Sequence, residues 1–291
     1  MTVLVTGASG FLGSHLVKKL VQKNFVVIAL KRSQSDLYRF DGYSGDFFLY
    51  NADEVPLEEI FSQHAIDVVI NTVTDYGRRG SSVFSMLETN LMFGLKILET
   101  ATLHGINAFI NTDTLLAKTI NPYALSKAQL VEWMRYYAEH SSTKMINVKI
   151  EHMYGPKDDD KKFISWLISQ LINRVETVDL TSGIQKRDFV YIDDVIRAYE
   201  AIIDHLDQCD SFEEFELGSG TSIEMKQFIS MIFSIISEQQ PLSTRLNFGA
   251  VPYRKGEAMV MEADIKKLQT FGWDPQTSLQ EGLKKTLAEY I

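Results

Sequence analysis

Tyr123 and Lys127 lie four residues apart in the segment NPYALSKAQL and carry the groups needed to move a proton. A helix places residues four apart on one face, so the phenol and the ammonium are expected to point the same way. An unperturbed phenol has a pKa of about 10 and is a poor acid at neutral pH, but a neighbouring ammonium favours the phenolate and lowers that pKa. Such a pair is common in helices, so its meaning depends on what accompanies it.

A glycine-rich loop accompanies it at the start of the chain, in VLVTGASGFLGSHLV. The Gly-x-x-Gly-x-x-Gly spacing follows an apolar run and opens an amphipathic stretch, which is the context that a dinucleotide site requires. The glycines permit a tight turn, a close approach of the pyrophosphate and close packing of helix on strand, and the helix N-terminus attracts the anion. The expected cofactor-binding residues of this loop are Gly7, Ser9, Gly10, Phe11, Leu12 and Gly13.

Lys31 and Arg32 follow the second apolar run, where an NAD site usually carries an acidic residue. Either cation suits a 2′-phosphate, so NADP(H) is favoured and NAD(H) is the alternative. A solvated charge pair remains an open interpretation, because one shift in register changes which side chain faces the ribose. Asp53, after the third run, is a candidate acceptor for the adenine amino group or a plain surface residue.

Short apolar runs alternate with longer amphipathic stretches through the first half of the chain, which predicts an α/β fold with a doubly wound, Rossmann-like parallel sheet. The continuous apolar character of the runs suits strands that are covered on both faces. The gap between the second and third runs is too short and irregular for a full crossover helix. Strands are expected at residues 3–6, 25–30, 46–50, 66–73, 106–112 and 146–150, and helices at 11–23, 83–104 and 122–140.

The pattern changes after Gly155-Pro156, which predicts a second, smaller lobe. We expect a dinucleotide-binding Rossmann domain at residues 1–155 and a mainly substrate-binding lobe at 156–291, with residues 188–207 packing back on the first domain. In the second lobe, residues 163–172 and 279–290 have helical patterns, and RDFVYIDDVIRAYEAI reads as a strand running into a helix.

The composition is that of an ordinary soluble protein, with 45% hydrophobic and 23% charged residues. A net charge of −9 argues against nucleic-acid binding, and no apolar run approaches a membrane span. The N-terminus lacks the basic start of a secretory signal, and the lone Cys209 excludes an intrachain disulfide, so a cytoplasmic location is expected. No metal site is expected: the KDDDKK loop near Asp158 reads as a solvated loop.

The chain resembles the extended short-chain dehydrogenases/reductases of the nucleotide-sugar epimerase/dehydratase family. The motifs TGASGFLG, NLMFGLKILETA, MYGP and RDFVYIDDV resemble those of the family, and they occur in the family's order around Tyr123 and Lys127. The resemblance covers nearly the whole chain. The segments NTVTDYGRRG, FINTDT, KIEHMYG and LTSGIQKRDFVYIDD are most similar to those of members that act as NADPH-dependent 4-ketoreductases on a CDP-linked deoxyhexulose.

The resemblance implies roles for individual residues. Tyr123 and Lys127 correspond to the catalytic Tyr and Lys, which also hold the cofactor, and Thr114 to the catalytic Ser/Thr, with Thr112 as the alternative. Asn90 corresponds to a helix Asn close to the cofactor. Arg254 resembles an Arg that clamps the sugar diphosphate, a task that suits its planar fork. The other expected substrate-binding residues are Tyr76 or Arg78 after the fourth strand, His152 and, with a weaker claim, Arg187.

Departures from the family pattern narrow the reaction. The sugar dehydratases carry Asp-Glu directly after the catalytic Thr, whereas Thr114 is followed by Leu115 and Leu116, which cannot transfer protons. Dehydration is therefore disfavoured. The Arg and Asn that usually precede the family's Tyr-Gly-Pro are replaced by Lys149 and His152. His152 is either a sugar contact or an ordinary core residue.

The leading hypothesis is an NADPH-dependent 4-ketoreductase of a nucleotide-linked 4-keto-6-deoxyhexose or of its 3,6-dideoxy counterpart. The product would be a deoxysugar donor for surface polysaccharide. Hydride is expected at C4, with Tyr123 as the proton donor. The nearest alternative is an NAD-dependent epimerase, which uses the same residues, and a non-catalytic dinucleotide-sensing protein is the alternative from another class. The resemblance further implies a homodimer formed through residues 83–104 and 122–140.

Overall fold

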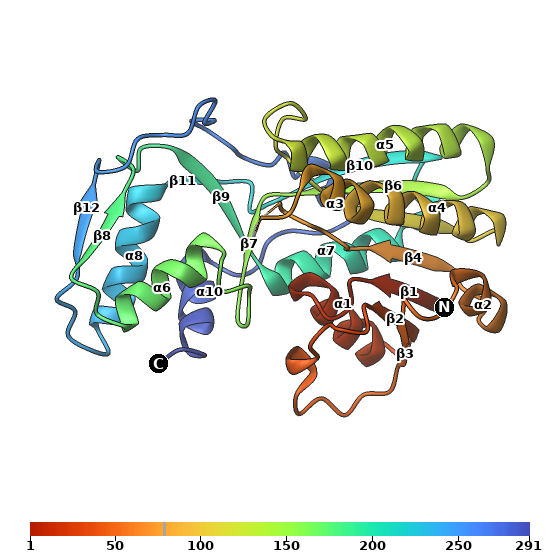
Figure 1. Ribbon diagram of the computed structural model, residues 1–291, viewed down its shortest axis with the longest axis horizontal. Coiled ribbons are helices and arrows are strands. Elements are labelled where there is room, and N and C mark those ends of the chain that lie inside the picture. The colour runs from red at the N-terminus through yellow and green to blue at the C-terminus, as the bar shows by residue number, and fades with distance from the viewer. Residues whose placement is uncertain (78–79) are drawn as a thin grey trace. The chain divides into compact units, whose positions relative to one another are not determined.

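The computed structural model describes residues 1–77 and 80–291, which fall into two compact units (Figure 1). The first unit comprises residues 1–150 and 199–215, and the second comprises residues 151–198 and 216–291. The expected domain limits at residues 155 and 156, and the expected packing of residues 188–207 on the first domain, stay predictions.

A seven-stranded sheet with the order β10-β6-β5-β4-β1-β2-β3 forms the centre of the first unit. The pairs from β3 to β6 are parallel, and the order reverses at β1, so the predicted doubly wound α/β class is confirmed. The six strands expected from apolar runs are all present. The strands are β1 (Thr2–Thr6), β2 (Val26–Lys31), β3 (Phe48–Asn51), β4 (Val68–Asn71), β5 (Ala108–Thr114), β6 (Lys144–Ile150) and β10 (Phe212–Leu217).

One face of this sheet is covered by α2 (Leu57–Gln63), α4 (Phe93–Leu103) and α5 (Pro122–His140). Side chains alternate along a strand, so every second residue of each strand enters the core beneath these helices. That core includes Leu4, Val69, Phe109 and Met145 from the strands and Ile97, Leu98, Leu130 and Met134 from the helices, all fully buried.

The opposite face carries α1 (Phe11–Gln22) and the C-terminal half of α7 (Ile192–Asp204). Thr112, which alternates with Phe109 and Asn111 along β5, bonds Tyr199 of α7 through the two hydroxyls at 2.6 Å. The carboxylate of Glu200 on α7 in turn lies 3.5 Å from the ammonium of Lys23, the residue that follows α1. Cover on both faces explains why the strands are apolar throughout their length.

The helix predicted at residues 83–104 is present without a break, but its geometry is not α-helical throughout. The structure has α3 (Val83–Leu87), a π-helical turn η2 (Glu88–Met92) and then α4. Single π turns of this kind often occur at functional sites. Here the turn contains Asn90, whose side-chain amide binds the backbone of Asp75 on both sides, through Oδ1 at 2.7 Å and Nδ2 at 2.8 Å.

The other helical predictions of the first unit hold. α5 begins where Asn121 accepts a hydrogen bond from the Ala124 N–H at 2.8 Å, with Pro122 at the first position, which is a favourable start for a helix. As expected, the connection from β2 to β3 contains no α-helix among its residues, only the 3-10 turn η1 (Tyr38–Phe40). α2 was not predicted.

The second unit contains a three-stranded sheet with the order β11-β9-β7 and a two-stranded sheet of β8 and β12. The predicted helices at residues 163–172 and 279–290, and the predicted strand that runs into a helix, are present as α6, α10 and the pair β9–α7. Phe189 of β9 stacks on Phe228 of α8, with ring centroids 3.7 Å apart. The elements are β7 (His152–Tyr154), α6 (Phe163–Ile172), β8 (Thr177–Leu180), β9 (Lys186–Tyr191), β11 (Ser222–Glu224), α8 (Met225–Ser237), β12 (Arg245–Phe248), α9 (Lys266–Thr270) and α10 (Leu279–Leu287).

Across the described ranges, no helix has both the length and the apolar character that crossing a bilayer demands.

Candidate active site

The glycine loop joins β1 to α1 in a conformation that glycine makes accessible. Gly7 has a φ of +61°, a left-handed value that disfavours other residues. A Cβ on Gly13 would collide with the backbone of Gly7 and Ala8, so this glycine lets the helix pack against the loop. Gly10 is the N-cap residue of α1. Within the described chain no side chain accepts a hydrogen bond from the first N–H groups of this helix, and no acidic residue lies in its first turn. This helix start therefore fits a pyrophosphate.

The two cations after β2 differ in their surroundings. Lys31 donates from its ammonium to the carbonyl oxygens of Arg32 and Ser33 at 3.1 and 3.2 Å, whereas Arg32 is exposed. Asp53 accepts hydrogen bonds from the Ser33 N–H at 2.8 Å and its hydroxyl at 2.6 Å, and these bonds lower the pKa of Asp53. Asp53 thus holds the loop that carries the cations, and Arg32 is the cation more available to a 2′-phosphate.

Lys127 is fully enclosed on α5. Its side chain is 1% exposed, and its Nζ has no hydrogen-bond partner within residues 1–77 and 80–291. Burial lowers the pKa of Lys127 to about 8, against the opposing pull of the Asp113 carboxylate. A buried ammonium without acceptors is costly, so the site is suited to a group that brings hydroxyl oxygens, such as the ribose of a dinucleotide.

Tyr123 is connected to Asn90 through Ser126. Asn90 donates to the Ser126 hydroxyl at 2.9 Å, and that hydroxyl donates to the backbone carbonyl of Tyr123 at 2.7 Å. The ring of Tyr76 lies against that of Tyr123, with centroids 5.1 Å apart. Since Asn90 also holds Asp75, one side chain fixes both the start of α5 and the segment that carries Tyr76.

The two threonines at the end of β5 are not equivalent. Thr112 is buried with its hydroxyl bonded to Tyr199, on the face of the sheet away from α5. Thr114 is half-buried at the strand end, where its hydroxyl accepts from the Leu116 N–H at 3.3 Å. This difference favours Thr114 over Thr112 as the hydroxyl for a substrate.

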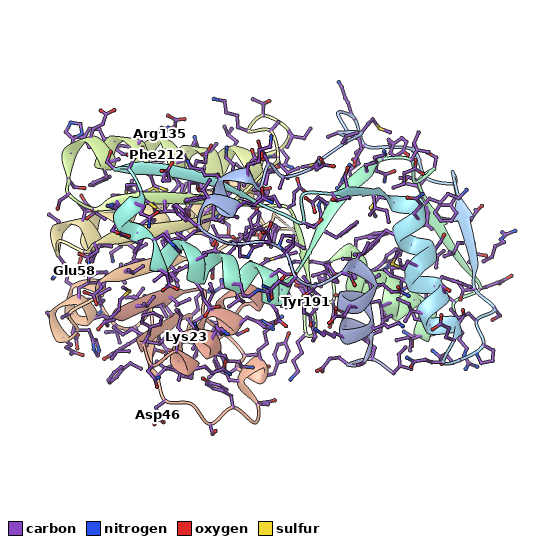
Figure 2. The ribbon with its side chains drawn as sticks, turned by 180° about the vertical axis from the view of Figure 1, so that it is seen from behind. Lys23, Asp46, Glu58, Arg135, Tyr191 and Phe212 are labelled. Atoms are coloured by element: carbon purple, nitrogen blue, oxygen red, sulfur yellow. The ribbon has the colours of Figure 1, made fainter. Side chains whose placement is uncertain are left out.

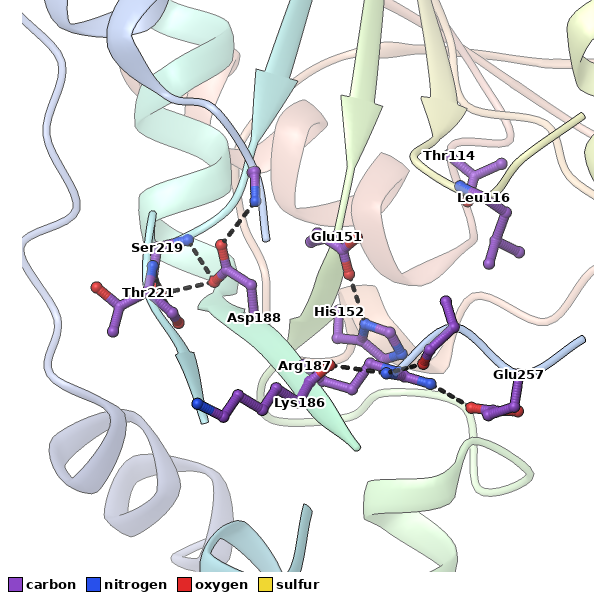
Figure 3. A network of polar contacts seen from close by, with 12 residues as sticks. Thr114, Leu116, Glu151, His152, Lys186, Arg187, Asp188, Ser219, Thr221 and Glu257 are labelled. Carbon is purple, nitrogen blue, oxygen red and sulfur yellow. Dashed lines mark hydrogen bonds and ion pairs between the residues drawn. The ribbon is translucent and has the colours of Figure 1, made fainter. Parts of the chain in front are cut away.

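In the second unit the structure connects two of the predicted arginines. Arg187 is 6% exposed and pairs with Glu257, while its guanidinium also donates to the Ala258 carbonyl at 2.8 Å (Figure 3). The Glu257 N–H bonds the carbonyl of the exposed Arg254 at 3.1 Å. Arg187 of β9 therefore holds the turn at residues 254–258, which carries Arg254.

His152 lies at the start of β7 and is partly exposed. Its Nδ1 is 2.8 Å from the carboxylate of the buried Glu151 (Figure 3). Its ring meets that of Phe189 edge to face, with centroids 5.5 Å apart. Arg78, the alternative to Tyr76, and its neighbour Arg79 lie outside the described residues. The part of the chain that is described contains no cluster of metal-binding side chains.

Sequence reasoning missed several residues that hold the candidate residues of each unit in place. Ser126 and Asp113 had no motif to mark them, because their roles depend on contacts with distant residues. Tyr253 was also missed, although its hydroxyl is 2.6 Å from that of Ser182 and donates to Gln185 at 2.9 Å, which anchors the segment before Arg254. The asparagines of VINT, FINT and MINV did carry a signal, since each breaks an apolar strand at a similar position.

The doubly wound sheet with a glycine loop after its first strand defines the class of dinucleotide-binding α/β enzymes. The chain matches the NAD dependent epimerase/dehydratase family over residues 3–218 and belongs to that family. The resemblance expected from the sequence motifs is thus confirmed, and the protein is an NAD(P)-dependent enzyme of the nucleotide-sugar epimerase/reductase kind.

Individual relatives cover the whole chain. CDP-abequose synthase of Salmonella typhimurium is 31% identical, over 98% of this chain and 97% of that protein. The UDP-glucose 4-epimerase of Thermotoga maritima, solved with UDP-glucose, has a TM-score of 0.84 at 24% identity and covers 100% of this chain and 98% of its own. The UDP-glucose 4-epimerase of Thermus thermophilus, solved with NAD, has a TM-score of 0.83 at 20% identity, with coverage of 100% and 99%.

The depressed pKa of Lys127 predicts how stability changes with pH. Below pH 8 the lysine is charged in both the folded and the unfolded state, so burying the charge lowers the stability of the folded state by its full amount. Above pH 8 the lysine of the folded state becomes neutral, and this loss of stability disappears by about pH 10.5. The variant Lys127→Met has no such loss at any pH. Its free energy of unfolding, taken relative to that of the wild type, should therefore be about 3 kcal/mol larger at pH 7 than at pH 10. Urea unfolding of both proteins between pH 7 and 10 measures this difference, and a difference independent of pH would contradict it.

Proposed function

We propose that this enzyme is an NADPH-dependent 4-ketoreductase of a nucleotide-linked 4-keto-6-deoxyhexose, with a 3,6-dideoxy sugar as the preferred substrate. The observation that carries the proposal is the full-length similarity to CDP-abequose synthase at 31% identity. The exposed Arg32 after β2 supports NADPH, the reductant that a biosynthetic reductase consumes.

A bound nicotinamide supplies the hydride chemistry, and residues of the first unit bind the cofactor and supply the proton. The turn of Gly7 and Gly10 receives the pyrophosphate, and the buried ammonium of Lys127 receives the ribose hydroxyls. Tyr123 donates its phenolic proton to the C4 oxygen as that oxygen gains electrons, and the Thr114 hydroxyl donates a hydrogen bond to the same oxygen.

The residues beside Thr114 support reduction over dehydration. A dehydratase needs an acid and a base to remove water from the sugar, and Leu115 and Leu116 stand where the family's dehydratases carry them. An epimerase would use the same Tyr123 and Lys127, so the cofactor distinguishes the two reactions: an epimerase returns the hydride and retains its NAD, whereas a reductase exchanges NADPH at every turnover.

We propose the following residues as contacts of the sugar nucleotide. Tyr76 packs on Tyr123 and is placed to contact the sugar. Arg254 supplies an exposed guanidinium for the diphosphate, while the guanidinium of Arg187 is already paired with Glu257 and acts first by holding the turn that carries Arg254. The partly exposed His152 is proposed as a further sugar contact.

We further propose a homodimer through α3, α4 and α5. Large apolar side chains are exposed along this helical region. They include Phe84 of α3 at 71%, Met92 of the π turn η2 at 57%, Leu103 of α4 at 82%, and Trp133 and Tyr136 of α5. Exposed apolar surface of this kind marks an interaction site, and a second copy of the chain would cover it. Sedimentation at micromolar concentration should give a dimer, and a monomer would contradict the proposal.

The variant Tyr123→Phe tests the proton donor. It should lose about 10³-fold in the rate of NADPH oxidation with a CDP-linked 4-keto-3,6-dideoxyhexose, because the general acid is gone. Its NADPH affinity should stay within about twofold of the wild type, since the ring remains. Tyr136→Phe, an exposed tyrosine on the same helix, is the matched control and should retain full activity. Equal activity of the two variants would exclude Tyr123 as the donor.

The variant Arg32→Ala tests the cofactor. NADPH affinity, followed by nicotinamide fluorescence, should fall about tenfold or more, whereas NADH affinity should not change, because only NADPH carries the 2′-phosphate. Arg245→Ala, at an exposed arginine of β12, is the control. If the purified wild type instead retains NAD tightly and shows no response to NADPH, the epimerase replaces the reductase as the proposed function.

A further inference from the structure

A continuous row of hydrogen-bonded polar side chains crosses the core of the first unit. The strand register places Thr6 beside Asn71, Asn71 beside Asn111, and Asn111 beside Asn147, on β1, β4, β5 and β6. Their side chains bond one another in that order at 2.8, 3.0 and 2.9 Å. All four residues are at most 1% exposed, so these side chains have no solvent to satisfy them.

The two ends of the row fix the direction of every amide. At one end the Thr6 hydroxyl accepts from the Thr72 N–H at 3.2 Å, so its proton is left for Asn71 Oδ1. At the other end Asn147 Nδ2 donates to two carboxylates, to Asp113 at 3.0 Å and to Glu214 at 3.1 Å. A carboxylate only accepts, so Asn147 must present its N–H₂ group there, and each preceding amide must be oriented the same way.

The row lies on the side of the sheet that α5 covers. Asn111 and Asp113 alternate with Thr112 along β5 and share the face of Phe109, which belongs to the core beneath α4 and α5. Asp113 is two residues farther along this face, and it is 8% exposed. Its other oxygen accepts the Thr114 N–H at 2.8 Å, so both oxygens are held in place. The ammonium that α5 brings to this face is that of Lys127, which is enclosed and has no hydrogen-bond partner in the described chain.

We propose that Asp113 is the counter-ion of Lys127, a positioning residue that keeps the buried ammonium charged, and that the amide row holds the Asp113 carboxylate in the place where it does so. Neither a family motif nor the reacting groups themselves identify Asp113. Its function would be exerted through Lys127, whose charge in turn sets the acidity of the proton donor Tyr123.

The other ionisable groups around Asp113 have partners of their own. Glu214 shares the Asn147 amide but is bonded to the ammonium of Lys149 and lies 3.8 Å from Arg135 of α5, which also covers the ring of Phe212 (Figure 2). Burial acts to raise the pKa of Glu214, but the bonds from Lys149 and Asn147 outweigh it and the pKa lies below its usual range. Tyr199, on the opposite face, stays a neutral phenol because burial raises its pKa. Asp113 is thus the carboxylate whose charge acts on Lys127.

A double-mutant cycle tests the pair without any substrate or cofactor. At pH 7, Asp113→Asn should lower the melting temperature by at least about 3 °C more in the wild-type background than in the Lys127→Met background, because only the former contains a charge to stabilise. At pH 10 this excess should vanish, since Lys127 is then neutral in the folded protein. Asp113→Glu, which keeps the charge, should restore part of the excess at pH 7.

Glu214→Gln is the matched control, because it removes the other carboxylate on the same Asn147 amide. Its effect on the melting temperature should be equal with and without Lys127. If Asp113→Asn behaves in the same way, with equal losses in both backgrounds at both pH values, Asp113 is a structural residue only and the proposal is wrong.

A second measurement rests on the proposed reductase. The ratio of kcat/KM between the wild type and Asp113→Asn should rise from pH 6 to pH 8.5, because the variant's lysine loses its proton at a lower pH. A ratio that is constant with pH would contradict the proposed effect on Lys127. Inactivity of the wild type in this assay would overturn the reductase alone, because the stability cycle does not depend on it.

Discussion

The packing of α5 on one face of the parallel sheet is the contact on which the candidate site depends. Leu130 and Met134 of this helix are fully buried in the core, and Gly94 of α4 allows close approach because a Cβ there would lie 2.7 Å from the Leu130 side chain. The same packing carries Lys127 out of solvent. A helix that is held this tightly presents Tyr123 and Lys127 in a fixed orientation, and the cost of enclosing the ammonium is offset by the stability of the core around it.

The buried charge of Lys127 must be balanced by polar or oppositely charged side chains around it. Asparagines replace apolar residues at neighbouring positions of three strands, at the end of β4 and in the middle of β5 and β6. Each asparagine satisfies its neighbour, so the row adds polarity to the core without leaving an unpaired group along it. The row ends at the carboxylates of Asp113 and Glu214, which is where positive charge from α5 and β6 must be balanced.

Asn90 has a comparable role at Ser126 of α5. The π turn that contains it departs from the regular helix expected for residues 83–104, and through this turn one amide reaches both the Asp75 backbone and Ser126. The residues proposed to bind cofactor and substrate in the first unit are therefore positioned by side chains that have no proposed chemical role themselves. This division is consistent with an enzyme whose relatives differ in reaction while sharing the fold.

The sequence alone determined the features that arise from local patterns. Apolar runs predicted six strands of the central sheet, the glycine spacing predicted the turn before α1, and the spacing of Tyr123 and Lys127 placed both on one helix. These inferences depend on periodicity and backbone conformation within a few residues. The tertiary structure decided which side chains meet across the sheet. The amide row with its carboxylate end, and the pairing of Arg187 with Glu257, join residues 34 to 70 positions apart in the chain. Strand order and register, which no local pattern encodes, bring such residues together.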